Sequence, residues 1–116
     1  MVGQHILNTV DVYDDGFLLV EHKNYYVECG NKPLKLGRAE FLIVSLLVQK
    51  VERFVSAEAI WNHLWEGGKP LNFESLKVMI CRLRRKFAPF GVRIEPMTNF
   101  GYKLVPPKEN KTSKFR

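Results

Sequence analysis

The segment that decides the fold is Ser75-Leu76-Lys77-Val78-Met79-Ile80-Cys81-Arg82-Leu83-Arg84-Arg85-Lys86-Phe87. Its apolar positions recur at spacings of four, three and four, and they are Leu76, Ile80, Leu83 and Phe87. At 100° per residue these side chains share a stripe about 60° wide, which is typical of a helix with one buried face. We expect the helix to begin near Asn72 or Phe73 and to end before Pro89 and Gly91.

The opposite face of this predicted helix is polar and basic. It carries Glu74, Val78, Cys81 and Arg85, with Ser75 and Arg82 on one flank. An α-helix fits the major groove of duplex DNA, and an arginine there can form a bidentate pair with guanine. Ordinary surface charges on a solvated amphipathic helix would give the same pattern, so the segment alone leaves both interpretations open.

Two further helices are predicted upstream. From Arg38 to about Lys50 the apolar residues lie three and four apart, and this helix is apolar almost all round, as a central core helix would be. After the extended link Phe54-Val55, Ser56 is a suitable N-cap for a second helix with an apolar face of Ile60, Trp61, Leu64 and Trp65. The segment Gly67-Gly68-Lys69-Pro70 ends that helix.

Short strands are predicted on both sides of the helices. Residues 9–13, 17–20, 25–29 and 34–36 are aromatic, β-branched or alternating, and turn residues separate them, at 30–33 among other places. Residues 92–95 and 102–105 predict a hairpin whose bend, 96–101, forms a wing. The expected fold class is α+β, with an N-terminal antiparallel β-meander, three helices and a C-terminal β-hairpin wing. Residues 9–107 form this domain, 1–8 an N-terminal extension and 108–116 a basic disordered tail.

Charge is distributed unevenly along the chain. Residues 1–73 hold 7 Lys/Arg and 9 Asp/Glu, whereas residues 74–116 hold 11 and 3, so the second part carries a net charge of +8. Such asymmetry suggests a polyanionic partner, either nucleic acid or an acidic membrane surface, although a solubilising charge run would look the same.

Composition excludes several function classes. No apolar run approaches a membrane span, and no signal peptide is visible, so we expect a cytoplasmic protein without a membrane partner. Cys29 and Cys81 have no zinc-ligand spacing, and His5, His22 and His63 share none for a metal. No catalytic grouping or phosphate-binding glycine loop is present, and we therefore expect no enzyme activity, no metal and no cofactor.

The order of the motifs is more specific than any one of them. The segments 34–41, 54–56, 60–65, 75–87 and Gly101-Tyr102-Lys103-Leu104 together resemble the winged helix-turn-helix output domain of OmpR/PhoB-type response regulators. The resemblance covers residues 9–106. It implies sequence-specific binding of double-stranded DNA, commonly by two copies on tandem half-sites, and transcription control in a two-component system.

The resemblance also assigns residue roles. Base contacts fall on Lys77, Val78 and Arg82, and phosphate contacts on Ser75, Arg84, Arg85 and Lys86. The wing is Met97-Thr98-Asn99, and the loop Glu66-Gly67-Gly68-Lys69 occupies the place that contacts RNA polymerase in some members. The chain departs from the family where Glu74 replaces a frequent cation, Lys77 replaces a frequent aspartate, and the wing lacks its usual arginine.

An alternative function is a winged-helix protein-interaction module without specific DNA binding. A pure docking helix needs exposed apolar anchors, whereas the outer face of the third predicted helix is basic. A response regulator also needs an aspartate-bearing receiver domain, for which 116 residues leave no room beside the output domain. The sequence is therefore either an output domain excised from a longer protein or a stand-alone regulator. The operator, the input signal and the choice between activation and repression do not follow from the sequence.

Overall fold

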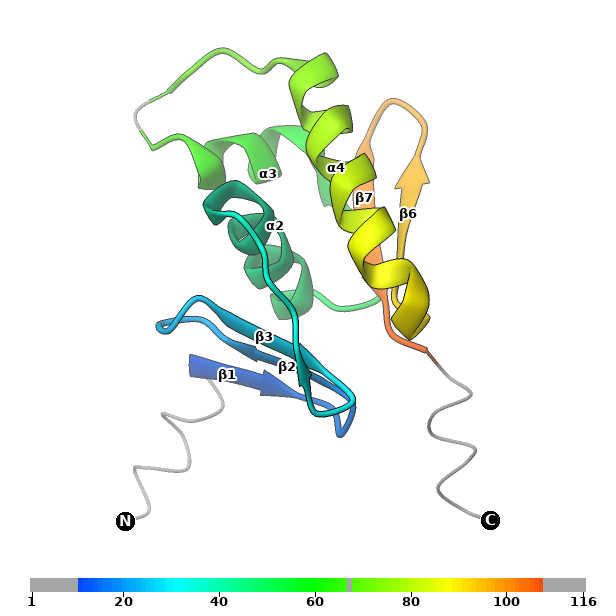
Figure 1. Cartoon of the computed structure of the whole chain (residues 1–116). Coiled ribbons are helices and arrows are strands. Elements are labelled where there is room, and N and C mark those ends of the chain that lie inside the picture. Colours follow the sequence, from blue (N-terminus) through cyan, green and yellow to red (C-terminus); the bar gives the residue numbers. More distant parts are fainter. Residues whose placement is uncertain (1–10, 67, 108–116) are drawn as a thin grey trace.

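The computed structural model describes residues 11–66 and 68–107. A four-stranded antiparallel sheet comes first, in the order β1-β2-β3-β4, and its strands are β1 (Val12–Asp14), β2 (Leu18–Glu21), β3 (Tyr26–Cys29) and β4 (Lys32–Pro33). Three helices follow, namely α2 (Arg38–Gln49), α3 (Ala57–Leu64) and α4 (Phe73–Phe87). The hairpin of β6 (Arg93–Met97) and β7 (Gly101–Val105) then packs beside α4 (Figure 1). This arrangement confirms the predicted α+β order of sheet, helices and hairpin.

Helix α2 lies at the centre, over the N-terminal sheet and beside the other two helices (Figure 1). The sheet turns four fully buried side chains from β2 and β3 toward it: Leu18, Val20, Val27 and Cys29. Their alternation with partly exposed residues is the period-two pattern of a sheet with one covered face. One core therefore spans the sheet, the helices and the hairpin.

Local caps set where the helices begin. The hydroxyl of Ser56 accepts a hydrogen bond from the Ala59 amide at 3.0 Å, and the side-chain oxygen of Asn72 accepts one from the Ser75 amide at 3.0 Å. Each bond satisfies an amide that the first helical turn leaves without a partner. The predicted Ser56 cap, and the predicted start of the third helix, are therefore confirmed.

The fourth strand was predicted at the wrong place. Gly30 and Asn31 both have positive φ, 55° and 70°, and they form a two-residue turn that pairs Cys29 directly with Lys32. The strand therefore occupies Lys32–Pro33, inside the predicted turn, and the alternating segment Leu34-Lys35-Leu36 is a link to α2.

The wing was also predicted too long. Strand β6 continues through Pro96 to Met97, which pairs with Gly101, so that only 98–100 form the turn. Asn99 adopts a left-handed conformation in this turn, with φ 61°.

The third strand of the hairpin's sheet was not predicted. The short strand β5 (Val55–Ser56), between α2 and α3, pairs with β7 and gives a three-stranded sheet in the order β5-β7-β6. Ser56 lies opposite Gly101, and the Ala57 amide donates to the Phe100 carbonyl at 2.8 Å. The hairpin is thereby attached to the start of α3 as well as to α4. The predicted extension 1–8, the start of the first predicted strand at 9–10 and the tail 108–116 lie outside the described residues.

Candidate nucleic-acid interface

Helix α4 separates its core side from its solvent side cleanly. Leu76, Ile80, Leu83 and Phe87 are at most 1% exposed, which confirms the predicted stripe. The exposed side chains on the other face line one shallow groove, and they are Glu74, Lys77, Val78, Cys81, Arg82 and Arg85. With three cations and one anion this groove carries a net positive charge. It contains all three predicted base contacts and one predicted phosphate contact, Arg85.

Two of the other predicted phosphate contacts bind the protein itself. The Arg84 Nε donates a hydrogen bond to the Ile94 carbonyl at 2.9 Å, and the guanidinium lies 6.0 Å from the centre of the Tyr102 ring. Arg84 is partly buried, so its charge is directed into the junction between α4 and the hairpin. Its visible role is to hold the helix against the wing.

Lys86 makes the corresponding contact on the other side of α4. Its Nζ lies 2.7 Å from Glu40 Oε1 and donates to the Lys35 carbonyl at 3.2 Å. Glu40 is 8% exposed, and the same oxygen accepts the Gly37 amide at 2.9 Å. Burial raises the pKa of the Glu40 carboxyl, but the hydrogen bonds from Lys86 and Gly37 and the attraction of Lys86 and Arg82 outweigh burial, so the pKa is lowered. The last turn of α4 is thus fixed to the first turn of α2.

Ser75 lies apart from the basic groove. It is partly buried and lines a separate cleft with residues of α3 and of the loop after it, including Trp61, Trp65 and Lys69. In that loop the Trp61 Nε1 donates to the Lys69 carbonyl at 3.1 Å, and the Lys69 ammonium lies 4.2 Å from the Trp65 ring centre. The two tryptophans therefore anchor this loop. Glu66, Gly68 and Lys69 are exposed, and Gly67 lies outside the described residues.

The wing presents apolar rather than basic side chains near its turn. Met97 and Phe100 are 44% and 45% exposed, and Thr98 and Asn99 lie between them. The cations of the hairpin are engaged at its other end, where Arg93 lies 2.8 Å and Lys103 3.8 Å from the Glu95 carboxylate. Sequence reasoning did not single out Phe73 and Phe100 as surface features, because hydropathy alone assigns an aromatic side chain to the core.

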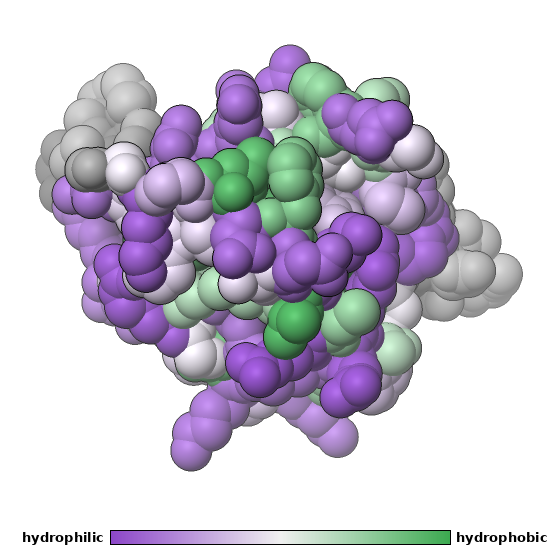
Figure 2. Space-filling view, turned by 90° about the horizontal axis from the view of Figure 1, so that it is seen from above, coloured by the Kyte–Doolittle hydropathy of each residue, from purple (hydrophilic) through white to green (hydrophobic). Residues whose placement is uncertain are grey.

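The space-filling view from above shows small green hydrophobic areas set among purple hydrophilic residues (Figure 2). Within the described residues, no group of three or more His, Cys, Asp or Glu side chains is placed to hold a metal ion. Among the described helices, none combines the length and the apolar character needed to cross a membrane.

The sequence matches a known family over most of the domain. Residues 31–104 match the family model for the C-terminal part of transcriptional regulatory proteins. The phosphate regulon transcriptional regulatory protein PhoB of Escherichia coli (strain K12) is 30% identical over 74 residues, which are 64% of this chain and 32% of PhoB. The response regulator protein GraR of Staphylococcus haemolyticus is 27% identical over 86 residues, 72% of this chain and 38% of GraR. The chain spans about a third of the length of these relatives.

Solved structures share the fold. The DNA-binding domain of RstA from Klebsiella pneumoniae, in complex with the RstA box, superposes with a TM-score of 0.65 at 25% identity and covers 82% of this chain and 97% of that one. The Thermotoga maritima response regulator DrrB, an OmpR/PhoB homologue, superposes with a TM-score of 0.71 at 23% identity and covers 89% and 49%. With the match over residues 31–104, these likenesses show that the chain belongs to the OmpR/PhoB-type family of winged helix-turn-helix output domains, the C-terminal domains of transcriptional regulatory proteins.

Proposed function

We propose that this domain binds duplex DNA sequence-specifically, with α4 in the major groove, and thereby regulates transcription. The observation that carries the proposal is the exposed face of α4, where Lys77, Arg82 and Arg85 surround Val78 while the opposite face is buried. A cationic helix with free side chains matches the width and the charge of the groove. Such a regulator works beside the DNA, in the cytoplasm.

The residue roles divide by position. Arg82 and Val78 contact base edges, because both are exposed near the centre of the outer face. Arg85, on the same face, contacts phosphate, and Ser75 contacts a further phosphate from the separate cleft that it lines. Arg84 and Lys86 both bind other groups of the protein, and they therefore orient the helix instead of contacting DNA phosphates.

The test compares Arg82→Ala with Arg85→Ala. The preferred duplex is first selected from random DNA, and affinities are then measured for that duplex and for a random one. Arg82→Ala should lose about 1–3 kcal/mol on the selected duplex and relax the preference at one base position. Arg85→Ala should weaken both duplexes by similar factors and reduce the slope of log affinity against log salt by about one unit. Equal losses for Arg82→Ala on both duplexes would make Arg82 a phosphate contact.

Two partner assignments belong to the same proposal. Two copies bind tandem half-sites head to tail, about one helical turn apart, so that both α4 helices meet one face of the DNA. Footprinting that shows a single isolated half-site would contradict this arrangement. The loop 66–69 contacts RNA polymerase through Glu66, which is exposed, and through Lys69, whose exposed side chain rests on the Trp65 ring. Charge reversal at Lys69 should then change transcription in vitro without changing DNA affinity.

The second candidate function is docking on a protein through α4. The exposure of Val78, at 49%, is the observation that favours it, since an apolar anchor on the outer face suits a protein partner. The selection from random DNA separates the two functions, because a docking module would enrich no sequence.

A further inference from the structure

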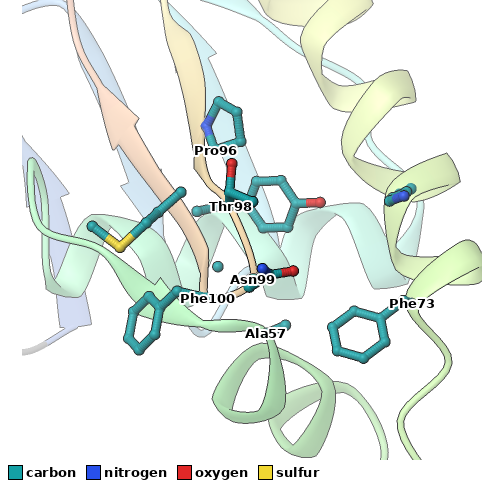
Figure 3. A pocket seen from close by; sticks show the side chains of 10 residues that line it. Ala57, Phe73, Pro96, Thr98, Asn99 and Phe100 are labelled. Carbon is teal, nitrogen blue, oxygen red and sulfur yellow. The ribbon is translucent and has the colours of Figure 1, made fainter.

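Two polar anchors of α4 lie in its last turn. At the first turn an open cleft of about 450 Å³ separates the helix from the wing, and Figure 3 shows Phe73 on one side of this cleft and Phe100 on the other. In the last turn Arg84 binds the hairpin and Lys86 binds α2. The cation on the α2 side has a consequence for DNA binding that the cation on the hairpin side does not share.

Arg82 and Lys86 are neighbours of like charge. They are four residues apart on α4, so both lie on the flank that faces α2, and two cations at this spacing repel each other. One buried anion attracts both of them. Burial raises the pKa of the Glu40 carboxyl, but its hydrogen bonds lower it, and the attraction of the Lys86 and Arg82 charges lowers it further. Glu40 bonds directly to Lys86, while Arg82 is exposed.

A DNA phosphate would have to compete with Glu40 for Lys86. The Lys86 side chain is 39% exposed, so its ammonium is open to solvent, whereas the side chain of Glu40 is 10% exposed. The attraction between two charges is stronger at such a partly buried site than in water. Moving Lys86 to a phosphate would also leave the Glu40 carboxylate buried without its partner, which is strongly unfavourable. The ion pair should therefore persist when DNA binds.

We propose that Glu40 is a positioning residue for DNA binding, because it keeps Lys86 on the protein and leaves the neighbouring Arg82 for the DNA. The inference rests on the proposed function, and it adds a residue of α2, away from the basic groove, to those that set DNA affinity. By withholding one cation from the phosphates, Glu40 limits the share of the affinity that any DNA sequence provides. A domain with a neutral residue at this position gains one phosphate contact.

The experiment measures the affinity for the selected duplex and for a random one over a range of salt concentrations. The proteins are the parent chain, Glu40→Gln, Lys86→Met and the double variant. Glutamine keeps a side-chain oxygen that can accept the Gly37 amide, as Glu40 does, but it removes the charge. Glu52→Gln is the matched control, because Glu52 is exposed, lies beyond the other end of α2 and carries the same charge. Melting temperatures establish that each variant is folded.

We expect Lys86→Met to keep the salt slope of the parent, because Lys86 contacts no phosphate in the parent complex. Glu40→Gln should bind both duplexes about three- to tenfold more tightly at about 0.1 M salt, with a slope steeper by about 0.9 and the same preferred sequence. The double variant should return to the slope of the parent, and Glu52→Gln should bind like the parent.

A scan of single methylphosphonates, each of which removes one phosphate charge, locates the new contact. Glu40→Gln should lose affinity at one strand position where neither the parent nor the double variant does. A purely structural role of Glu40 would not produce this difference.

Other outcomes overturn the inference in distinguishable ways. A slope reduced by about 0.9 in Lys86→Met would show that Lys86 already contacts a phosphate in the parent complex. An equal gain for Glu40→Gln with and without Lys86 would mean that Glu40 acts only by long-range repulsion. Weaker binding by a folded Glu40→Gln would make the ion pair a support for α4 and no more. A parent that binds random DNA but enriches no sequence would overturn the proposed function alone, and a parent that binds no DNA would overturn both.

Discussion

Replacing Gly101 by alanine tests how firmly the wing is attached to the rest of the domain. Gly101 is buried in β7 opposite Ser56, and a Cβ added there would overlap the Val55 carbonyl oxygen and lie 2.8 Å from the Ser56 Cα. Both obstacles are backbone atoms, which no rotamer change can move. The substitution must therefore push β5 and β7 apart.

The expected loss of stability follows from the contacts that are broken when β5 and β7 separate. The pairings Val55–Tyr102 and Ser56–Gly101 and the hydrogen bond from Ala57 to Phe100 would be lost or stretched. With about three hydrogen bonds at roughly 0.5–1.5 kcal/mol each, and overpacking at roughly 1–3 kcal/mol, we expect the free energy of unfolding to fall by about 3–5 kcal/mol. For a domain of this size the melting temperature should fall by more than about 10 °C.

Gly68→Ala is the matched control. Gly68 has φ +85°, but an added Cβ meets nothing within 4 Å, so only the backbone conformation is penalised, by about 1–2 kcal/mol. Thermal unfolding followed by far-ultraviolet circular dichroism compares the two variants. If Gly101→Ala melts within about 2 °C of Gly68→Ala, the backbone at β5 yields freely and our account of the wing attachment is wrong.

Three further predictions concern stability. Leu83→Ala should destabilise the domain by about 2–5 kcal/mol in denaturant titrations, since Leu83 is fully buried, and a midpoint equal to the parent's would contradict the orientation of α4. Lys86→Met should lower the free energy of unfolding by about 1–3 kcal/mol, because it leaves the Glu40 carboxylate buried without its ion-pair partner. Adding Glu40→Gln to this variant should recover part of the lost stability, and strictly additive losses would refute the coupling between the two residues. Burial lowers the pKa of both His22 and His63 in the folded domain, so the unfolded chain binds more protons below about pH 6.5. The free energy of unfolding should therefore decrease as the pH falls below that value. A flat profile of this free energy from about pH 7.5 to 5.5 would contradict the prediction.

Helix positions could be predicted because their signals are local. The spacing of Leu76, Ile80 and Leu83, and the caps at Ser56 and Asn72, act within one or two turns of chain. The misplaced fourth strand shows the limit of such signals. Leu34 and Leu36 alternate like strand residues, but the two-residue turn at Gly30-Asn31 had already begun the pairing two residues earlier.

The parts that sequence reasoning missed depend on distant partners. Strand β5 contains two residues with no distinctive pattern, and it is a strand only because β7 pairs with it. On α4, Arg84 and Lys86 look like the exposed Arg85 between them. They differ from Arg85 because Arg84 binds the Ile94 carbonyl on the hairpin and Lys86 binds the Glu40 carboxylate on α2. A helical projection of α4 contains neither of these partners.

The pairing of β5 with β7 constrains how the domain is made. All of α3 and α4 lie between the two strands in the sequence. When α4 has just been synthesised, the two groups that Arg84 contacts on the hairpin, the Ile94 carbonyl and the Tyr102 ring, have not yet been made. Until β7 emerges, β5 has no ladder partner in the second sheet, and the core to which the apolar stripe of α4 belongs lacks Leu104. Closing so long a loop is slow compared with forming the helices themselves. The nascent chain therefore exposes apolar side chains of α4 until the last strand of the hairpin is synthesised, and at this stage a chaperone or a protease would encounter it.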